Sequence, residues 1–383
     1  MKYQLLMKKI STLFIVAISI ASLNLQAAIF ITPKKPSISA ASYVVLDYNS
    51  GAVIASNKPH EKRAPASLTK LMTAYVVFQL IKDGRASLDD DVKISKKAWE
   101  TMGSKSFVEV GKTIKLEILL KGMIIQSGND AAVALAEHIA GTEGTFTAYM
   151  NEYALELGMN NTRFENASGL DLNDQHTTAA DMAKLAAATI RDFPEFYPWY
   201  SEKEFTHHDI KQPNRNKLLW SDNTVDGLKT GYTKKAGYNL VASANRMGMR
   251  LVSVVLGSSG TEARTSQTQK ILDYGFRFFE TKTIDSISKK IPISGSTKDE
   301  IKVGLENTKS VTLPRGQYKL SKQMIELNAD LSGPINKGDN VGYLVVKFEG
   351  KNLLKLPLVA LEDAPESGFF SRIWSWLMSL LGL

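Results

Sequence analysis

Residues 65–70 read Pro-Ala-Ser-Leu-Thr-Lys and begin the stretch that decides the fold of this 383-residue chain. The apolar residues that follow recur near the i, i+3, i+4 spacing of a helix. They are Leu68, Leu71, Met72, Tyr75, Val76 and Leu80. Ser67 and Lys70 stand three positions apart at the start of this pattern, and such residues share one face of a helix. We therefore expect the Lys70 amine to reach the Ser67 hydroxyl.

This pairing indicates nucleophilic catalysis. A serine is a poor nucleophile until a base takes its proton. A lysine can be that base only if burial or nearby positive charge lowers its pKa. The helix N-terminus at Ser67 also offers a backbone N–H to a developing oxyanion. Ser67 and Lys70 are thus a candidate nucleophile and base.

A second motif, Ser127-Gly128-Asn129, falls in a predicted loop between helices over residues 115–126 and 130–139. Ser127 can relay a proton towards a leaving amine, and Asn129 can hold a substrate amide. A third motif, Lys229-Thr230-Gly231, precedes a predicted strand. Its lysine offers a positive charge to a substrate carboxylate, and its field would help to keep Lys70 neutral. Each motif alone is common, but the three together in this order predict a catalytic site.

Helices and strands alternate along the first three quarters of the chain. Residues 43–55 predict a hairpin, because two β-branched runs flank an Asp-Tyr-Asn-Ser-Gly turn. Residues 240–244 and 250–256 predict two strands, and residues 181–190 and 265–280 predict helices. This mixture indicates an α/β (α+β) catalytic domain over residues 29–285.

The sequence pattern changes after about residue 285. Apolar residues alternate with polar ones at Leu344, Val346 and Phe348, and again at Leu354, Leu356 and Leu358. Period-two alternation with turn residues between short runs predicts antiparallel strands. We expect a small β-sandwich domain over residues 286–363 that carries no catalytic group.

The two ends of the chain indicate export and membrane attachment. Residues 1–28 combine three lysines, an apolar run and a small-residue cleavage site, which is typical of a signal peptide; an uncleaved anchor is the alternative. Residues 364–383 predict an amphipathic membrane anchor, because two Phe and two Trp follow an acidic linker. At roughly 22 Å the helix over residues 369–383 is too short to span a bilayer and fits the membrane interface; docking on the protein's own core is the alternative.

Composition excludes several classes of function. The chain has no cysteine, so thiol catalysis, iron–sulfur clusters and disulfide scaffolds are excluded. The five histidines show no zinc-ligand spacing, and we expect no metal and no cofactor. The net charge of +8 is weak evidence for nucleic acid, which we do not expect as a partner of an exported protein.

The three motifs resemble those of the serine penicillin-binding proteins and serine β-lactamases, and most of all those of the D-alanyl-D-alanine carboxypeptidases. Further stretches that carry the resemblance are residues 167–171 (ASGLD) and 225–231 (VDGLKTG). The resemblance implies a mainly antiparallel sheet flanked by helices. It implies as substrate the D-Ala-D-Ala end of the peptidoglycan stem peptide, and as inhibitors the β-lactam antibiotics, at the periplasmic face of the inner membrane.

The resemblance also assigns roles, residue by residue. Ser67 would form the acyl-ester, Lys70 would be the base and Ser127 a proton relay. The residues that would bind substrate are Asn129, Lys229, Thr230, Gly231, Tyr232 and Arg264. The oxyanion would be held by the backbone N–H groups of Ser67 and Tyr232. Arg264 would contact the terminal carboxylate, although a solvated arginine is the alternative, and Tyr232 stands where relatives often have histidine.

Three rival functions remain open. A β-lactamase needs a further carboxylate for deacylation, and no E-x-x-L-N segment occurs between Ser127 and Lys229. A D,D-endopeptidase would use the same fold on crosslinked peptides. A non-catalytic envelope-binding protein would not need all three motifs, and a labelled penicillin would separate it because it would not be acylated.

Overall fold

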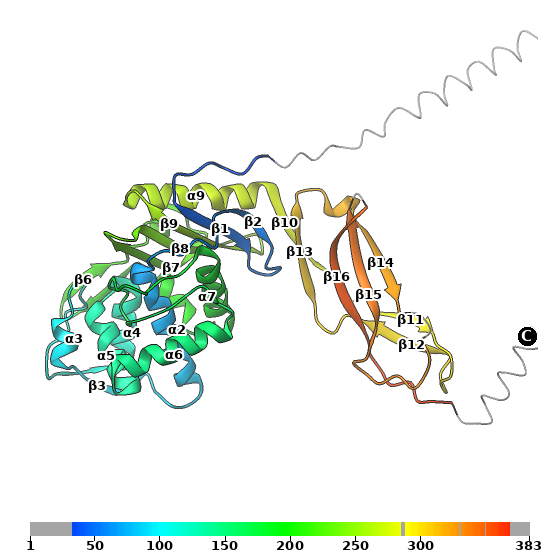
Figure 1. The fold of residues 1–383 in the computed structure, drawn as a ribbon, viewed down its shortest axis with the longest axis horizontal. Helices are drawn as coiled ribbons and strands as arrows, with labels where there is room; N and C mark the ends of the chain where they lie inside the picture. The colour runs from blue at the N-terminus through cyan, green and yellow to red at the C-terminus, as the bar shows by residue number, and fades with distance from the viewer. Residues whose placement is uncertain (1–32, 285–287, 329–330, 349, 368–383) are drawn as a thin grey trace, which may run out of the picture. The chain divides into compact units, whose positions relative to one another are not determined.

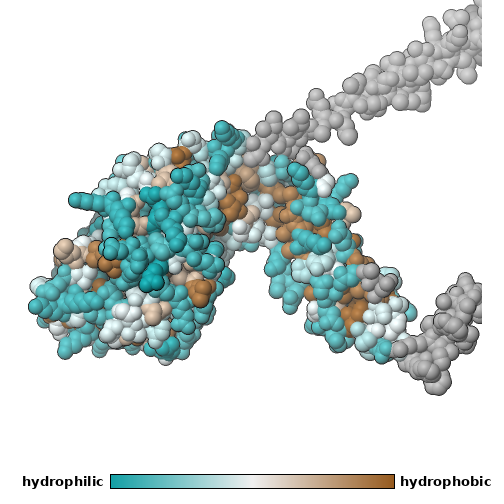
Figure 2. Space-filling view, viewed as in Figure 1, coloured by the Kyte–Doolittle hydropathy of each residue, from teal (hydrophilic) through white to brown (hydrophobic). Residues whose placement is uncertain are grey.

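The computed structural model describes residues 33–284, 288–328, 331–348 and 350–367 (Figure 1). The predicted signal peptide and terminal membrane helix lie outside the described residues. Within these residues no helix combines the length and apolar character needed to cross a membrane. The face in Figure 2 is largely hydrophilic over the N-terminal part of the fold, with scattered apolar patches.

A five-stranded antiparallel sheet organises the first part of the chain. Its strands, in the spatial order β2-β1-β9-β8-β7, come from both ends of the catalytic part. They are β2 (Val53–Asn57), β1 (Ser42–Asp47), β9 (Met249–Ser258), β8 (Gly237–Arg246) and β7 (Val225–Thr233). The predicted hairpin and the two predicted strands are confirmed, and Val44 of β1 pairs with Val254 of β9.

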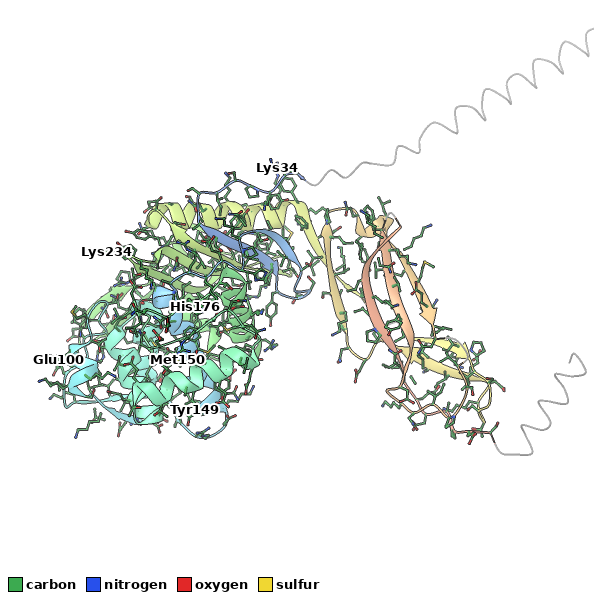
Figure 3. All side chains as sticks on the ribbon, viewed as in Figure 1. Lys34, Glu100, Tyr149, Met150, His176 and Lys234 are labelled. Atoms are coloured by element: carbon green, nitrogen blue, oxygen red, sulfur yellow. The ribbon has the colours of Figure 1, made fainter. Side chains whose placement is uncertain are left out.

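Both faces of this sheet are buried, because neighbouring strand residues point to opposite sides. Val44 faces a core formed with α2 (Thr69–Lys82) and α7 (Ala179–Asp192). Its neighbours Tyr43 and Val45 face a second core formed with α9 (Thr261–Phe278). Figure 1 shows α9 on one face and the other long helices on the opposite face, and side chains fill both interfaces in Figure 3. The predicted α+β class with helices flanking an antiparallel sheet is confirmed.

Several of the remaining elements of this part pack around α2. The helical ones are η1 (Ala66–Leu68), α3 (Lys96–Glu100), α4 (Leu116–Lys121), η2 (Gly122–Gln126), α5 (Asn129–Ala140), α6 (Glu143–Glu156), η3 (Tyr197–Ser201) and α8 (Leu218–Ser221). Two small hairpins pair β3 (Asp91–Lys93) with β4 (Thr113–Lys115) and β5 (Glu204–His207) with β6 (Ile210–Pro213). Because α2 is apolar around most of its circumference, it forms the buried centre of the helical layer.

Two local predictions need correction, and two elements were not predicted. The Lys229-Thr230-Gly231 motif precedes β8, as predicted, but itself lies inside β7, which was not predicted because only pairing with β8 overrides the weak β propensity of this segment. Arg264 lies in the first turn of α9 and not before it. The helix over residues 115–126 changes from α to π at Gly122. Sequence analysis missed α6, because most of its surface is polar and only Phe146, Met150 and Ala154 are buried.

The C-terminal part is β-rich, as predicted. A five-stranded sheet in the order β11-β12-β16-β15-β14 packs with a two-stranded sheet of β10 and β13 around one apolar core. These strands are β10 (Phe279–Ile284), β11 (Ser288–Pro292), β12 (Glu300–Gly304), β13 (Lys309–Pro314), β14 (Lys322–Leu327), β15 (Asn340–Phe348) and β16 (Lys351–Ala360), with a short η4 (Tyr318–Leu320). Residues 344–348 and 354–358 fall in β15 and β16, where alternation predicted them.

One close contact fixes the backbone that precedes α2. Gly169 has φ +87°, and a Cβ added there would lie 1.9 Å from the carbonyl oxygen of Ala66. Ala66 itself has φ +50°, a conformation that an alanine adopts only when its surroundings impose it. The loop around Gly169 therefore packs directly on the backbone that precedes Ser67.

We predict that Gly169→Ala lowers the melting temperature more than Gly141→Ala does. Both glycines have positive φ, which costs an alanine roughly 1–2 kcal/mol, but a Cβ at Gly141 meets no atom within 4 Å. At Gly169 the backbone must also move, which adds roughly 1–3 kcal/mol. Thermal unfolding of both variants measures the difference, at about 2–4 °C per kcal/mol. Equal losses in the two variants would contradict the contact.

Candidate active site

The amine of Lys70 is the point at which three segments meet. Lys70 is buried in the first turn of α2, and its Nζ lies 3.0 Å from Ser67 Oγ. It donates to Asn129 Oδ1 at 2.7 Å and to the backbone carbonyl of Ser168 at 2.5 Å. The predicted contact between Ser67 and Lys70 is thus present, and Asn129 of the second motif reaches the same nitrogen.

The surroundings of Lys70 favour its neutral form. Burial lowers its pKa to about 7, the Arg215 guanidinium acts in the same direction, and the Asp130 carboxylate opposes them. In the described part of the chain Lys70 forms no ion pair with a carboxylate. A large fraction of Lys70 is therefore deprotonated at neutral pH, as a base requires.

Ser67 lies in the 3₁₀ turn η1 that leads into α2. Strand β7 passes close to this turn, since a Cβ added to Gly231 would lie 3.1 Å from both the Pro65 carbonyl oxygen and the Ser67 nitrogen. Asn239 of β8 donates to the Pro65 carbonyl at 3.2 Å. The absence of a side chain at Gly231 lets the strand and the serine backbone form one wall.

The second motif turns sharply between two helical segments. Ser127 ends the π-helical turn η2 in the left-handed conformation, with φ 72° and ψ 32°. Its hydroxyl is buried and finds no hydrogen-bond partner among the described residues. Asn129 begins α5 and donates from Nδ2 to the Met102 carbonyl at 2.6 Å while Oδ1 accepts from Lys70. Both amide atoms of Asn129 are thereby fixed.

Strand β7 brings the third motif to the same place. Lys229 is buried, and burial holds its pKa well below the ordinary lysine value. The nearby cations that add to this effect are Lys70, Arg215 and Arg264. The next residue, Thr230, faces the cavity described below, whereas Lys229 lies behind its surface. Tyr232 exposes about half of its side chain and packs against Tyr238, with ring centroids 4.3 Å apart.

Arg264 reaches the site from the first turn of α9. Its Nη1 donates to the backbone carbonyls of Gly231, at 3.3 Å, and Asn239, at 3.4 Å. Burial and the nearby Arg215 lower the pKa of Arg264 to about 10, which still leaves it charged at neutral pH. Its side chain is only 6% exposed, so the alternative of a solvated arginine is wrong.

These residues surround one cavity of about 510 Å³. Its lining residues are Ser67, Gly103, Ser104, Ser127, Asn129, Ser168, Gly169, Leu170, Arg215, Thr230, Gly231, Tyr232, Thr233, Tyr238, Thr261 and Arg264. Ser67, Ser127 and Arg264 thus face one space, although Ser67 and Arg264 lie almost 200 positions apart in the chain. No group of three potential metal-ligating side chains occurs among residues the structure describes.

Sequence analysis missed two contributors to this site. Residues 167–171 carried the resemblance, but no pattern indicated that the Ser168 carbonyl accepts from Lys70. Arg215 belongs to no motif and follows the β5–β6 hairpin, yet it is the cation that acts on Lys70. Sequence analysis expected the positive charge of Lys229 to help keep Lys70 neutral. In the structure Lys229 is itself a buried amine with a lowered pKa.

Comparison with known proteins identifies the family of this chain. Residues 30–260 match the family model described as D-alanyl-D-alanine carboxypeptidase, and residues 278–366 match the model for the C-terminal domain of penicillin-binding protein 5. The D-alanyl-D-alanine carboxypeptidase DacC of Escherichia coli (strain K12) is 45% identical over 358 residues, which cover 91% of this chain and 90% of that relative.

A solved structure and a more distant relative complete the comparison. Penicillin-binding protein 5 from Haemophilus influenzae superposes with a TM-score of 0.84 at 41% identity, covering 88% of this chain and all of that one. The D-alanyl-D-alanine endopeptidase of Escherichia coli is 35% identical over 222 residues, which cover only 55% of this chain and 68% of that relative. The chain therefore belongs to the D-alanyl-D-alanine carboxypeptidase family of serine hydrolases.

Proposed function

We propose that this protein removes the terminal D-alanine from peptidoglycan stem peptides through an acyl-enzyme at Ser67, and that penicillins acylate the same serine. The observation that carries the proposal is the buried Lys70 amine within hydrogen-bond distance of the Ser67 hydroxyl. Family membership supports the reaction class, and the cavity supports the choice of residues.

The acylation step follows from the hydrogen-bonding capacity of a neutral amine. Such an amine has two N–H groups and one lone pair. The two carbonyl acceptors, Asn129 Oδ1 and Ser168 O, take the two N–H groups. The lone pair is then directed at the Ser67 hydroxyl, from which it accepts the proton as Oγ attacks the substrate carbonyl carbon. Below about pH 7 Lys70 is protonated and has no lone pair to offer, so acylation falls as pH drops.

Ser127 is the proposed proton relay to the leaving group. Its buried hydroxyl lines the cavity and is unpartnered among the described residues, so it can donate to the amine of the departing D-alanine. The backbone N–H groups of Ser67 and Tyr232 are the proposed oxyanion hole. Because the Tyr232 side chain is half exposed, its proposed contribution comes from the backbone.

Substrate binding is assigned to the two sides of the cavity. Asn129 would hold a backbone amide of the stem peptide on one side. On the other side Arg264 and the Thr230 hydroxyl would bind the terminal carboxylate, with Gly231 allowing the peptide to lie close to the strand. Lys229 would act from behind Thr230, whose carbonyl lies 3.4 Å from Lys229 Nζ. Such a cationic side wall would favour substrates that end in a free carboxylate.

Carboxypeptidase activity is favoured over the three rivals. The carboxypeptidase relative matches nine tenths of the chain, the endopeptidase relative just over half. A β-lactamase would need a carboxylate placed for deacylation, and the residues that line the cavity include no Asp or Glu. A non-catalytic binding protein would not need a buried amine beside a serine. Export by residues 1–28 and anchoring at the periplasmic membrane face by residues 364–383 complete the proposal.

Product analysis tests the reaction. We predict that the protein releases one D-alanine from a pentapeptide ending in D-Ala-D-Ala, and leaves a crosslinked muropeptide largely intact, as seen by mass spectrometry. Ser67→Ala is expected to lose both D-alanine release and labelling by fluorescent penicillin. Ser266→Ala, an exposed serine of α9, is the matched control and keeps both. Faster cleavage of the crosslinked substrate would establish the endopeptidase instead.

The carboxylate contact predicts a selective loss in Arg264→Gln. A desolvated charge pair broken from one side costs about 2 kcal/mol or more, which is roughly 30-fold in kcat/KM. The loss should appear with the free-acid peptide and be much smaller with its C-terminal amide. Arg277→Gln, which removes an exposed arginine from the same helix, should leave both substrates unaffected. An equal loss on acid and amide would show that Arg264 does not bind the carboxylate.

Membrane attachment predicts a separate behaviour of the tail. Deleting residues 369–383 should release the mature protein from membranes while peptide hydrolysis persists, because every motif residue precedes residue 265. Only Arg372 is cationic in this segment, so binding of the full chain should resist a moderate salt wash, unlike that of a polybasic anchor. Sedimentation of envelope membranes with and without salt measures this. A truncated protein that still sediments would contradict the assignment.

A further inference from the structure

Arg215 is a charged residue of the cavity for which neither the motifs nor the resemblance provides a role. It lies two residues after the end of β6, and its side chain is accessible where it lines the cavity with Ser67, Ser127 and Arg264. The hairpin itself is attached to the cavity rim, because Gln212 of β6 donates to the Lys105 carbonyl at 3.0 Å. The position of Arg215 is therefore set by a structural element that contains no motif.

Gln126 connects Arg215 to the turn that carries Ser127. In the orientation of its amide that satisfies both atoms, Gln126 accepts from Arg215 Nη2 and from Gln212 Nε2, each at 3.2 Å, and donates to the Pro213 carbonyl at 3.2 Å. Gln126 is the last residue of η2, and Ser127 follows it. One amide thus joins the guanidinium, the hairpin and the second motif.

We propose that Arg215 is a positioning residue of the acylation site, a permanent cation that the β5–β6 hairpin and Gln126 hold on the cavity wall and that acts on the reaction through Lys70. This inference rests on the proposed function. Lys229 is a buried amine whose own pKa is lowered, so it loses its charge at a lower pH than an ordinary lysine does. A guanidinium remains charged throughout the working range of the enzyme.

The charged groups around Lys70 come from three further elements. Asp130 of α5 stabilises the ammonium form, whereas Arg215 disfavours it. Lys229 of β7 is coupled to Lys70, and Arg264 of α9 acts on Lys229. The Asp130 carboxylate already accepts from the backbone N–H of Ser106 at 2.8 Å and that of Ala131 at 2.9 Å. Removing the charge of Arg215 leaves Asp130 in place, and Lys70 should then hold its proton to higher pH.

The test is the pH dependence of acylation by a fluorescent penicillin, measured on the full mature chain. In Arg215→Gln and Arg215→Met we expect the acid limb of the rate profile to move by about half to one unit towards higher pH. Below that limb the rate should fall roughly three- to tenfold. Arg215→Lys keeps the charge and should keep the wild-type limb. Lys211→Gln removes an exposed cation from β6 of the same hairpin and should match the wild type.

The outcomes separate this inference from the proposed function. A wild-type protein that is never labelled overturns the proposed function itself. If the wild type is labelled but the acid limb is unshifted in both Arg215→Gln and Arg215→Met, the proposed role of Arg215 is overturned. A fall in their plateau rates alone would not rescue it, because a merely structural role lowers the rate equally at every pH. Melting temperatures of the variants identify any loss of folding, and a shifted limb in one folded variant with rescue in Arg215→Lys supports the proposal.

Discussion

The burial of one amine without a carboxylate partner is the constraint on which the site depends. A buried ammonium is costly unless it is paired, and the usual outcome is a lowered pKa. The fold places Lys70 in the first turn of its most buried helix and surrounds its nitrogen with a hydroxyl and two carbonyl oxygens. A carboxylate at either carbonyl position would keep the lysine protonated and inactive as a base. The choice of neutral acceptors is therefore part of the chemistry.

The same arrangement makes the cavity electropositive. Arg215 and Arg264 line it, Lys229 lies behind its surface, and no carboxylate residue is among those that line it. Like charges held together destabilise the free protein and are offset when an anion enters. In the proposed function, a substrate that ends in a carboxylate would bring that anion and would be oriented with its terminal peptide bond towards Ser67. Substrate recognition and activation of the base would thus use the same positive field.

Sequence patterns predicted the parts of this site that are local in the chain. Three-residue spacing on a helix is enough to place Lys70 beside Ser67, and alternation is enough to find β15 and β16 of the C-terminal part. The contribution of the Ser168 carbonyl could not be predicted, because backbone acceptors have no residue signature. Arg215 was also beyond prediction, since only the tertiary placement of the β5–β6 hairpin brings it to the cavity. Lys229 was located by its motif, but its burial inside β7 depends on sheet pairing.

A direct titration of Lys70 tests the central claim most closely. The protein labelled with ¹³C at the lysine ε-carbons gives one NMR signal per lysine, and the Lys70 signal is identified by its absence in Lys70→Arg. The account predicts that this signal titrates with a pKa of about 7, while exposed lysines titrate near the ordinary value of about 10.4. A Lys70 signal that titrates together with the exposed lysines would contradict the account, because the amine would then be protonated at every pH at which the enzyme works.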